Sequence, residues 1–196
     1  MLVFVLSVLT LHGVHAACNM VRNKQNKYRR LSTPLDICSG ICPTDPAIQN
    51  QIVDTHNAFR RAVQPSAANM LKMIWSDDVA ALSQAWLDHC ILKHGPPSTR
   101  MLNGYELGEN LFYSSSAMDW TAVITTWHKE VHDYTYPSGS ENGESVGHYT
   151  QVVWNSSWQV GCGMTKCGSI YFYGCQYYRA YVGHTFETLF SVGVIE

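Results

Sequence analysis

The chain has 196 residues, of which 46% are apolar and 14% are charged, so it can form a sizeable core and wholesale disorder is excluded. Its formal net charge of −2 excludes a strongly basic nucleic-acid-binding protein, and no apolar run reaches the roughly 18 residues that a membrane-spanning helix needs. The charge is unevenly distributed, because residues 22–30 hold five of the 13 Lys and Arg, whereas residues 31–196 hold eight bases against 15 acids.

Residues 1–17 have the pattern of a secretory signal peptide. An apolar run extends from Leu2 to Leu11, and small residues at Val14 and Ala16 provide a suitable cleavage point. No Lys or Arg precedes the run, so only the α-amino group supplies positive charge there. The alternative is a buried strand at the true N-terminus. The signal-peptide pattern leads us to predict a secreted, extracellular protein.

The number of cysteines is odd, and an exported chain can keep disulfide bonds. The seven are Cys18, Cys38, Cys42, Cys90, Cys162, Cys167 and Cys175. An odd number requires an unbridged thiol, an intermolecular bond or the removal of one cysteine. Residues 18–46 form a basic and Cys/Pro-rich N-terminal segment, and cleavage after the dibasic pair that ends at Arg30 would remove Cys18. We hypothesise a propeptide up to Arg30, and the alternative is a basic arm that stays attached.

Three stretches have the apolar periodicity of helices. They cover residues 47–64, 76–93 and 116–134. The predicted capping residues are Thr44, Ser76 and Ser116, and Asp77 and Asp78 in the first turn of the second helix suit the helix dipole. Residues 31–46, which precede the first helix, are predicted to be a linker or a loop held by disulfide bonds.

The predicted strands concentrate in the last third of the chain. Residues 148–154, 158–164 and 170–178 are rich in Val, Tyr, Phe and Trp, which favour sheets, and shorter extended stretches are predicted at 70–75 and 109–113. Helices followed by a series of strands favour an α+β domain or an α-β-α sandwich.

The histidines are the first candidates for chemistry. His128 and His132 share a helix face, but the H-E-x-x-H zinc motif requires Glu directly after the first His, whereas Glu130 lies two residues after His128, about 200° round the helix. Two surface histidines that flank an inward glutamate explain this stretch better. Taken singly, His94, Glu109, Glu130 and His148 are typical surface or capping residues. The chain has no nucleophile elbow, phosphate-binding loop or dinucleotide motif, and Asn155 begins a glycosylation sequon that matters only after export.

Several motifs together resemble the CAP superfamily, which contains cysteine-rich secretory proteins, venom allergens and plant pathogenesis-related proteins. Residues 147–156, GHYTQVVWNS, look like its first signature, and residues 172–180, FYGCQYYRA, resemble its second in the first half. Further matches are residues 53–57, 60–61, 70–73, 108–110 and 127–128. The resemblance covers residues 47–180 and is nearest to the vertebrate cysteine-rich secretory proteins. Residues 181–196 diverge from the family, which would continue with a cysteine-dense C-terminal module, and we predict that this tail is loosely ordered.

The resemblance implies a three-layer α-β-α sandwich with a central mixed or antiparallel sheet and a cleft that contains His94, Glu109, Glu130 and His148. In relatives the two histidines can bind a divalent metal, often zinc, and each glutamate can orient a histidine. The implied disulfides are Cys90–Cys167 and Cys162–Cys175. A further family disulfide would join the positions occupied here by Leu107 and Tyr178, and we hypothesise that their packing offsets part of its loss.

Three functions are compatible with this resemblance. The first is a secreted binding protein for a lipid or sterol, with zinc as the optional metal. The second is a zinc-dependent hydrolase with Glu109 or Glu130 as general base. The third is an extracellular module that binds a protein receptor. Neither a nucleophile nor an oxyanion hole is evident, so we place binding or interaction ahead of catalysis, and we expect no nucleic-acid partner.

Overall fold

The computed structural model describes residues 16–17, 38 and 40–179. Residues 1–15, 18–37, 39 and 180–196 lie outside the described residues, and with them most of the predicted signal peptide, the hypothesised propeptide up to Arg30 and the divergent tail 181–196. Ala16–Ala17 form β1, which pairs antiparallel with Thr165 and Lys166. None of the helices in residues 40–179 has both the length and the apolar character to cross a bilayer.

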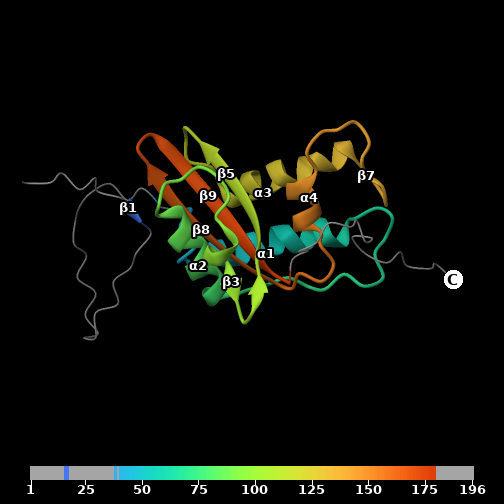
Figure 1. Cartoon of the computed structure of the whole chain (residues 1–196), viewed down its shortest axis with the longest axis horizontal. Coiled ribbons are helices and arrows are strands. Elements are labelled where there is room, and N and C mark those ends of the chain that lie inside the picture. The colour runs from blue at the N-terminus through green and yellow to red at the C-terminus, as the bar shows by residue number, and fades with distance from the viewer. Residues whose placement is uncertain (1–15, 18–37, 39, 180–196) are drawn as a thin grey trace, which may run out of the picture.

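The central sheet is mixed. Three strands, β5 (Gly108–Ser114), β9 (Ile170–Tyr178) and β8 (Gln159–Cys167), pair antiparallel in this order. β2 (Ile74–Trp75) pairs parallel with Gln159 and Val160 of β8, and β1 pairs with the other end of the same strand. Two small hairpins lie apart from this sheet, β3 (Met101–Leu102) with β4 (Tyr105–Glu106) and β6 (Tyr134–Thr135) with β7 (Gly139–Ser140). The long strands run side by side in Figure 1.

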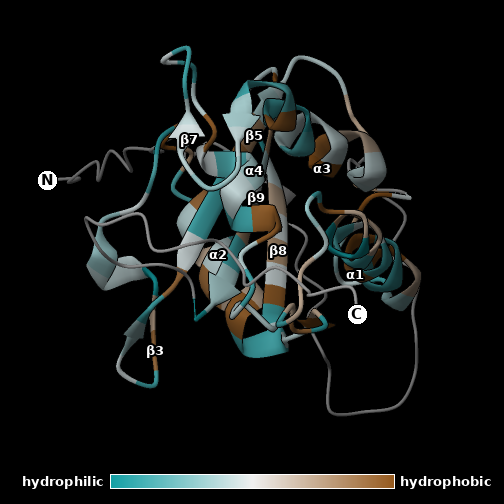
Figure 2. Ribbon diagram, turned by 90° about the vertical axis from the view of Figure 1, so that its right-hand side faces the viewer, coloured by the Kyte–Doolittle hydropathy of each residue, from teal (hydrophilic) through white to brown (hydrophobic). Residues whose placement is uncertain are grey.

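Helices cover both faces of the sheet. Three of them, α1 (Pro46–Arg61), α3 (Trp120–His128) and α4 (Gly147–Val152), contact one another and share a core with the sheet. The fourth, α2 (Asp77–Leu87), packs on the opposite face of β8 and β9. Figure 2 shows α1 and α3 on one side of β8 and α2 on the other. The predicted α+β, three-layer α-β-α architecture is therefore confirmed.

Successive side chains of a strand point to opposite faces of the sheet, so alternate residues of β8 face different helices. Val160, Cys162 and Met164 enter the core shared with α1, α3 and α4. Gly161 and Gly163 point to the other face, where a Cβ atom at Gly161 would lie 2.0 Å from the backbone nitrogen of Ala80. The glycines therefore allow α2 to approach the sheet at backbone contact distance.

Both predicted disulfides are present. Cys162 and Cys175 are direct cross-strand partners of β8 and β9 and are bonded to each other. Cys90 is bonded to Cys167, and Cys42 is also disulfide-bonded, in agreement with the predicted disulfide-held loop before α1.

The first two helices differ from the prediction at their ends. The cap of α1 is Asp45, whose carboxylate accepts a hydrogen bond from the N–H of Ala47, and not Thr44. The cap of α2 is Ser76 as predicted, but α2 ends at Leu87 and not at Lys93. The left-handed backbone of Cys90, which has a φ of 54°, is incompatible with a continuing helix.

The third predicted helix also differs at its ends, and one predicted strand is wrong. α3 begins after Asp119, whose carboxylate accepts from the N–H of Ala122, and ends at His128, where the 3-10 helix η2 (Lys129–Asp133) follows. Residues 148–154, predicted as a strand, contain most of α4 and the turn after it. The sheet propensity of these residues does not decide their structure. The helical arrangement buries Tyr149, Val152 and Val153 in the core, and the carboxylate of Glu130 accepts hydrogen bonds from N–H groups in the first turn of the helix. A second 3-10 helix, η1, covers Pro97–Thr99.

Candidate functional site

The first candidate pair joins His94, in the loop after α2, to Glu109 on β5. The Nδ1 atom of His94 lies 2.9 Å from Oε1 of Glu109. The same oxygen accepts from the backbone N–H of Gly95, and the other carboxylate oxygen accepts from the Gln176 side chain. The Glu109 side chain is only 3% exposed, whereas that of His94 is 60% exposed. A buried, fixed carboxylate thus orients a solvent-accessible imidazole.

The second pair joins His148, at the start of α4, to Glu130 on η2. Their Nδ1 and Oε1 atoms are 2.6 Å apart, and the other oxygen of Glu130 accepts from the backbone N–H groups of His148 and Tyr149. The ring of Trp127 lies parallel to the imidazole, with the ring centres 6.4 Å apart. The side chain of His148 is 33% exposed. Glu130 therefore holds both the ring and the backbone of His148.

The four predicted residues thus form two His–Glu pairs with the same chemistry. A carboxylate can only accept, so each Nδ1 carries the proton and each Nε2 retains its lone pair in the neutral imidazole. This is the arrangement in which a carboxylate orients a metal-binding histidine. Within residues 40–179, no three or more His, Cys, Asp or Glu side chains are grouped to hold a metal ion. Each histidine can therefore offer one imidazole nitrogen to a metal, and the described residues hold no closed structural site of three or more such ligands.

Sequence reasoning missed two kinds of contact at these pairs. Gln176 and the backbone of Gly95 complete the shell of Glu109, and the side chain of Asn110 donates to the backbone carbonyl of His148 at 3.0 Å. Gln176 and Asn110 both lie inside motifs that the sequence analysis quoted. The contact of Gln176 depends on the cross-strand pairing of β9 with β5, and that of Asn110 depends on the packing of β5 against α4. A linear motif contains neither.

The prediction of two surface histidines beside Glu130 is half wrong. His132 is exposed, but His128 is partly buried and stacks on Phe59 with ring centres 3.8 Å apart. Burial is the main cause that lowers the pKa of His128, and His132 adds to it.

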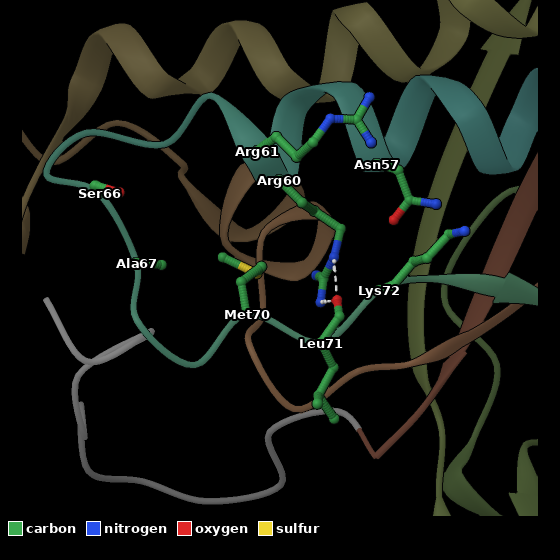
Figure 3. A pocket seen from close by; sticks show the side chains of 8 residues that line it. All are labelled: Asn57, Arg60, Arg61, Ser66, Ala67, Met70, Leu71 and Lys72. Atoms are coloured by element: carbon green, nitrogen blue, oxygen red, sulfur yellow. Dashed lines mark hydrogen bonds between the residues drawn. The ribbon is translucent and has the colours of Figure 1, made fainter. Parts of the chain in front are cut away.

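A separate pocket of about 360 Å³ lies at the end of α1. Its lining combines the apolar Ala67, Met70 and Leu71 with Asn57, Arg60, Arg61, Ser66 and Lys72, and Figure 3 shows them. Arg60 is 2% exposed, and its guanidinium donates to the backbone carbonyls of Leu71, Val152, Trp154, Asn155 and Ser157. Burial lowers its pKa to about 10. Arg60 thus fixes the pocket wall, and Arg61 and Lys72 are the exposed cations.

The predicted glycosylation site, Asn155, contacts Arg60 in the wall of this pocket. Asn155 is half-buried and its carbonyl accepts from Arg60 and from the N–H of Leu71. Ser157, the hydroxyl residue of the sequon, is fully buried. Glycosylation of Asn155 stays a prediction.

The sequence profile of the cysteine-rich secretory protein (CAP) family matches residues 53–178, and the chain belongs to this family. Among solved structures it is similar to NaASP2 with Zn²⁺, at 25% identity and a TM-score of 0.65, with 76% of this chain and 87% of that chain covered. It shares its fold with Schistosoma mansoni venom allergen-like protein 4, at 24% identity and a TM-score of 0.63, covering 75% and 96% of the two chains. The fold also matches the hookworm platelet inhibitor, at 17% identity and a TM-score of 0.62, covering 81% and 82%.

Proposed function

We propose that the protein is secreted and acts as an extracellular binding module that holds a divalent metal, zinc in the first place, through His94 and His148. The observation that carries this proposal is the repeated pairing of Nδ1 with a carboxylate at both histidines. It leaves the two Nε2 atoms as the ligands. NaASP2, a relative by fold, was solved with Zn²⁺, which supports zinc as the first metal to test.

The carboxylates have a supporting role in this proposal. Glu109 and Glu130 each accept three hydrogen bonds from fixed N–H groups, two of them in each case from groups other than the histidine ring. Such carboxylates are suited to orienting an imidazole rather than to taking a proton from water. The bound metal would supply a Lewis-acidic centre with open positions for a partner's carboxylate or for water. Binding is therefore favoured over the alternative zinc-dependent hydrolase.

Calorimetry on the metal-free exported protein tests the metal site. We expect about one zinc per chain, and we expect His94→Ala and His148→Ala each to weaken binding by more than about tenfold, because even outer-shell changes cost 10- to 100-fold. The matched controls are His89→Ala and His132→Ala, which remove exposed histidines outside the pairs. Absence of binding, or equal loss in a control, would contradict the proposal.

A lipid or sterol is the second candidate ligand, and the pocket of Figure 3 supports it. The volume falls within the range of small-molecule sites, and its apolar Met70 and Leu71 lie in the same lining as the cations Arg61 and Lys72. This combination suits an amphiphile with an anionic head group. We expect a fluorescent fatty acid to bind, and Arg61→Glu/Lys72→Glu to abolish binding. Retention of binding in this variant would exclude the pocket as the lipid site, and a protein receptor would then be the partner to seek.

Export itself is tested by the N-terminal sequence of protein collected from the medium of expressing cells. A start at Leu31 would support the propeptide, and a start at Cys18 would exclude it. Retention of the protein inside the cells would contradict secretion.

A further inference from the structure

A chain of buried polar groups connects α1 to the second His–Glu pair. His56 on α1, Tyr177 on β9 and Asn110 on β5 are all at most 1% exposed. The Nε2 atom of His56 lies 3.0 Å from the Tyr177 hydroxyl, and Asn110 Nδ2 lies 3.4 Å from that hydroxyl and 3.0 Å from the carbonyl oxygen of His148. Side chains from three elements thus form one hydrogen-bonded chain that ends, through Asn110, on a backbone carbonyl of α4.

The direction of every hydrogen bond in this chain is determined. Nδ1 of His56 lies 2.8 Å from the carbonyl of Ile52, which can only accept, so Nδ1 carries the proton. Burial lowers the pKa of His56 to about 4, so the ring is neutral and Nε2 accepts from the Tyr177 hydroxyl. The oxygen of Tyr177 then accepts one N–H of Asn110, and the second N–H of Asn110 donates to His148. The Asn110 amide therefore has a single orientation that satisfies both contacts.

The first turn of α4 is held from both sides as a result. Glu130 accepts the N–H groups of His148 and Tyr149, while Asn110 binds the carbonyl of His148. Asn110 also directly follows Glu109, the carboxylate of the first pair, on β5. Asn110 is therefore the residue through which the backbone of one pair is tied to the backbone of the other.

We propose that Asn110, oriented by Tyr177 and His56, is a positioning residue that fixes the two His–Glu pairs relative to each other. This inference rests on the proposed function only for its effect on metal affinity. Its geometric content, the placement of the His148 imidazole, is testable without metal.

The test compares isosteric changes in the network with matched changes outside it. Asn110→Asp replaces the donating amide by oxygen, and Tyr177→Phe removes the hydroxyl. Asn57→Asp is the matched asparagine control, since Asn57 is 4% exposed and its amide donates to the carbonyl of Met73. Tyr173→Phe is the matched tyrosine control, since its hydroxyl bonds to the backbone of Met118.

The first measurement is the Cε1–Hε1 NMR signal of the His148 ring in metal-free, full-length protein at one pH. We expect Asn110→Asp and Tyr177→Phe to move this signal well beyond the spread of the two controls, with the fold retained by circular dichroism. Equal displacement in the controls, or no displacement in folded Asn110→Asp, would overturn the inference.

The second measurement is zinc affinity by calorimetry. We expect about tenfold weaker binding in Asn110→Asp and Tyr177→Phe, at the low end of outer-shell effects, and less than a twofold change in the controls. Failure of the unaltered protein to bind zinc would refute the proposed metal function, whereas the NMR comparison would still decide the positioning role. Unaltered affinity in Asn110→Asp, with zinc bound by the parent protein, would overturn the positioning role.

Discussion

Acidification should destabilise the fold through His56. Burial lowers the pKa of this ring from 6.5 to about 4, the hydrogen bond to Ile52 opposes this shift, and the charge of Arg60 adds to it. The unfolded chain therefore takes up a proton near pH 6.5, whereas the folded protein takes it up only near pH 4. Between these values the unfolded state binds more protons, so the free energy of unfolding falls as the pH falls.

The magnitude follows from the size of the shift. Each pKa unit corresponds to about 1.4 kcal/mol, so His56 contributes about 3 kcal/mol of stability that is present above its unfolded pKa and lost by about pH 4. The predicted slope between the two pKa values is about 1.4 kcal/mol per pH unit. This loss is a large fraction of the stability of an ordinary domain.

Urea unfolding of the parent protein and of His56→Gln across this pH range measures the effect. The other titrating groups, including the partly buried His128, are present in both proteins and largely cancel in the difference. We expect the parent protein's advantage at neutral pH to shrink by about 3 kcal/mol towards pH 4. A difference that stays constant with pH would refute the assignment of His56 as a neutral, buried acceptor.

Three other substitutions test the packing that supports the site, each by urea unfolding. Arg60→Ala should cost at least about 4 kcal/mol because it leaves several buried carbonyls without a donor, whereas the exposed neighbour Arg61→Ala should change stability by less than about 0.5 kcal/mol. Gly161→Ala should cost about 3 kcal/mol or more because the new methyl group meets the backbone of α2, whereas Gly147→Ala, which has nothing within 4 Å, should be tolerated. Leu107→Ala should cost about 2–5 kcal/mol because this side chain is fully buried. A loss below about 1 kcal/mol in any of the three buried variants would contradict the corresponding packing argument.

Local signals in the sequence predicted most of the fold. The Ser76 cap and the acidic first turn located the start of α2, and the β-branched and aromatic run located β9 at residues 170–178, as observed. Local sequence patterns mispredicted the segment whose secondary structure is determined by a tertiary contact. The helix α4 depends on Glu130, which precedes His148 by 18 residues, and no window of local propensity includes that carboxylate.

The site was predictable as a set of residues but not as a geometry. The resemblance to the family named His94, Glu109, Glu130 and His148, because their order along the chain matches its motifs. Which glutamate forms the hydrogen bond with which histidine depends on long-range packing. The same holds for Asn110, whose amide reaches α4 from an edge strand.

The two positions at which the resemblance implies a missing family disulfide are both buried. Leu107 is fully buried and Tyr178 is 9% exposed, and both pack with Val79 in a second, smaller core. The ring of Tyr178 also makes edge contacts with Tyr105 and Trp158. The hypothesis that packing at these positions offsets part of the lost cross-link agrees with this cluster, and the stability of Leu107→Ala tests it.

X-ray absorption at the zinc edge tests the central claim most directly, because it identifies the atoms bound to the metal. For the exported protein loaded with one equivalent of zinc, the account predicts two imidazole nitrogens at roughly 2.0–2.1 Å and oxygen in the remaining positions. The double variant His94→Ala/His148→Ala should lose this signal. A sulfur ligand, or an unchanged spectrum in the double variant, would contradict the assignment of these two histidines as the metal-binding residues.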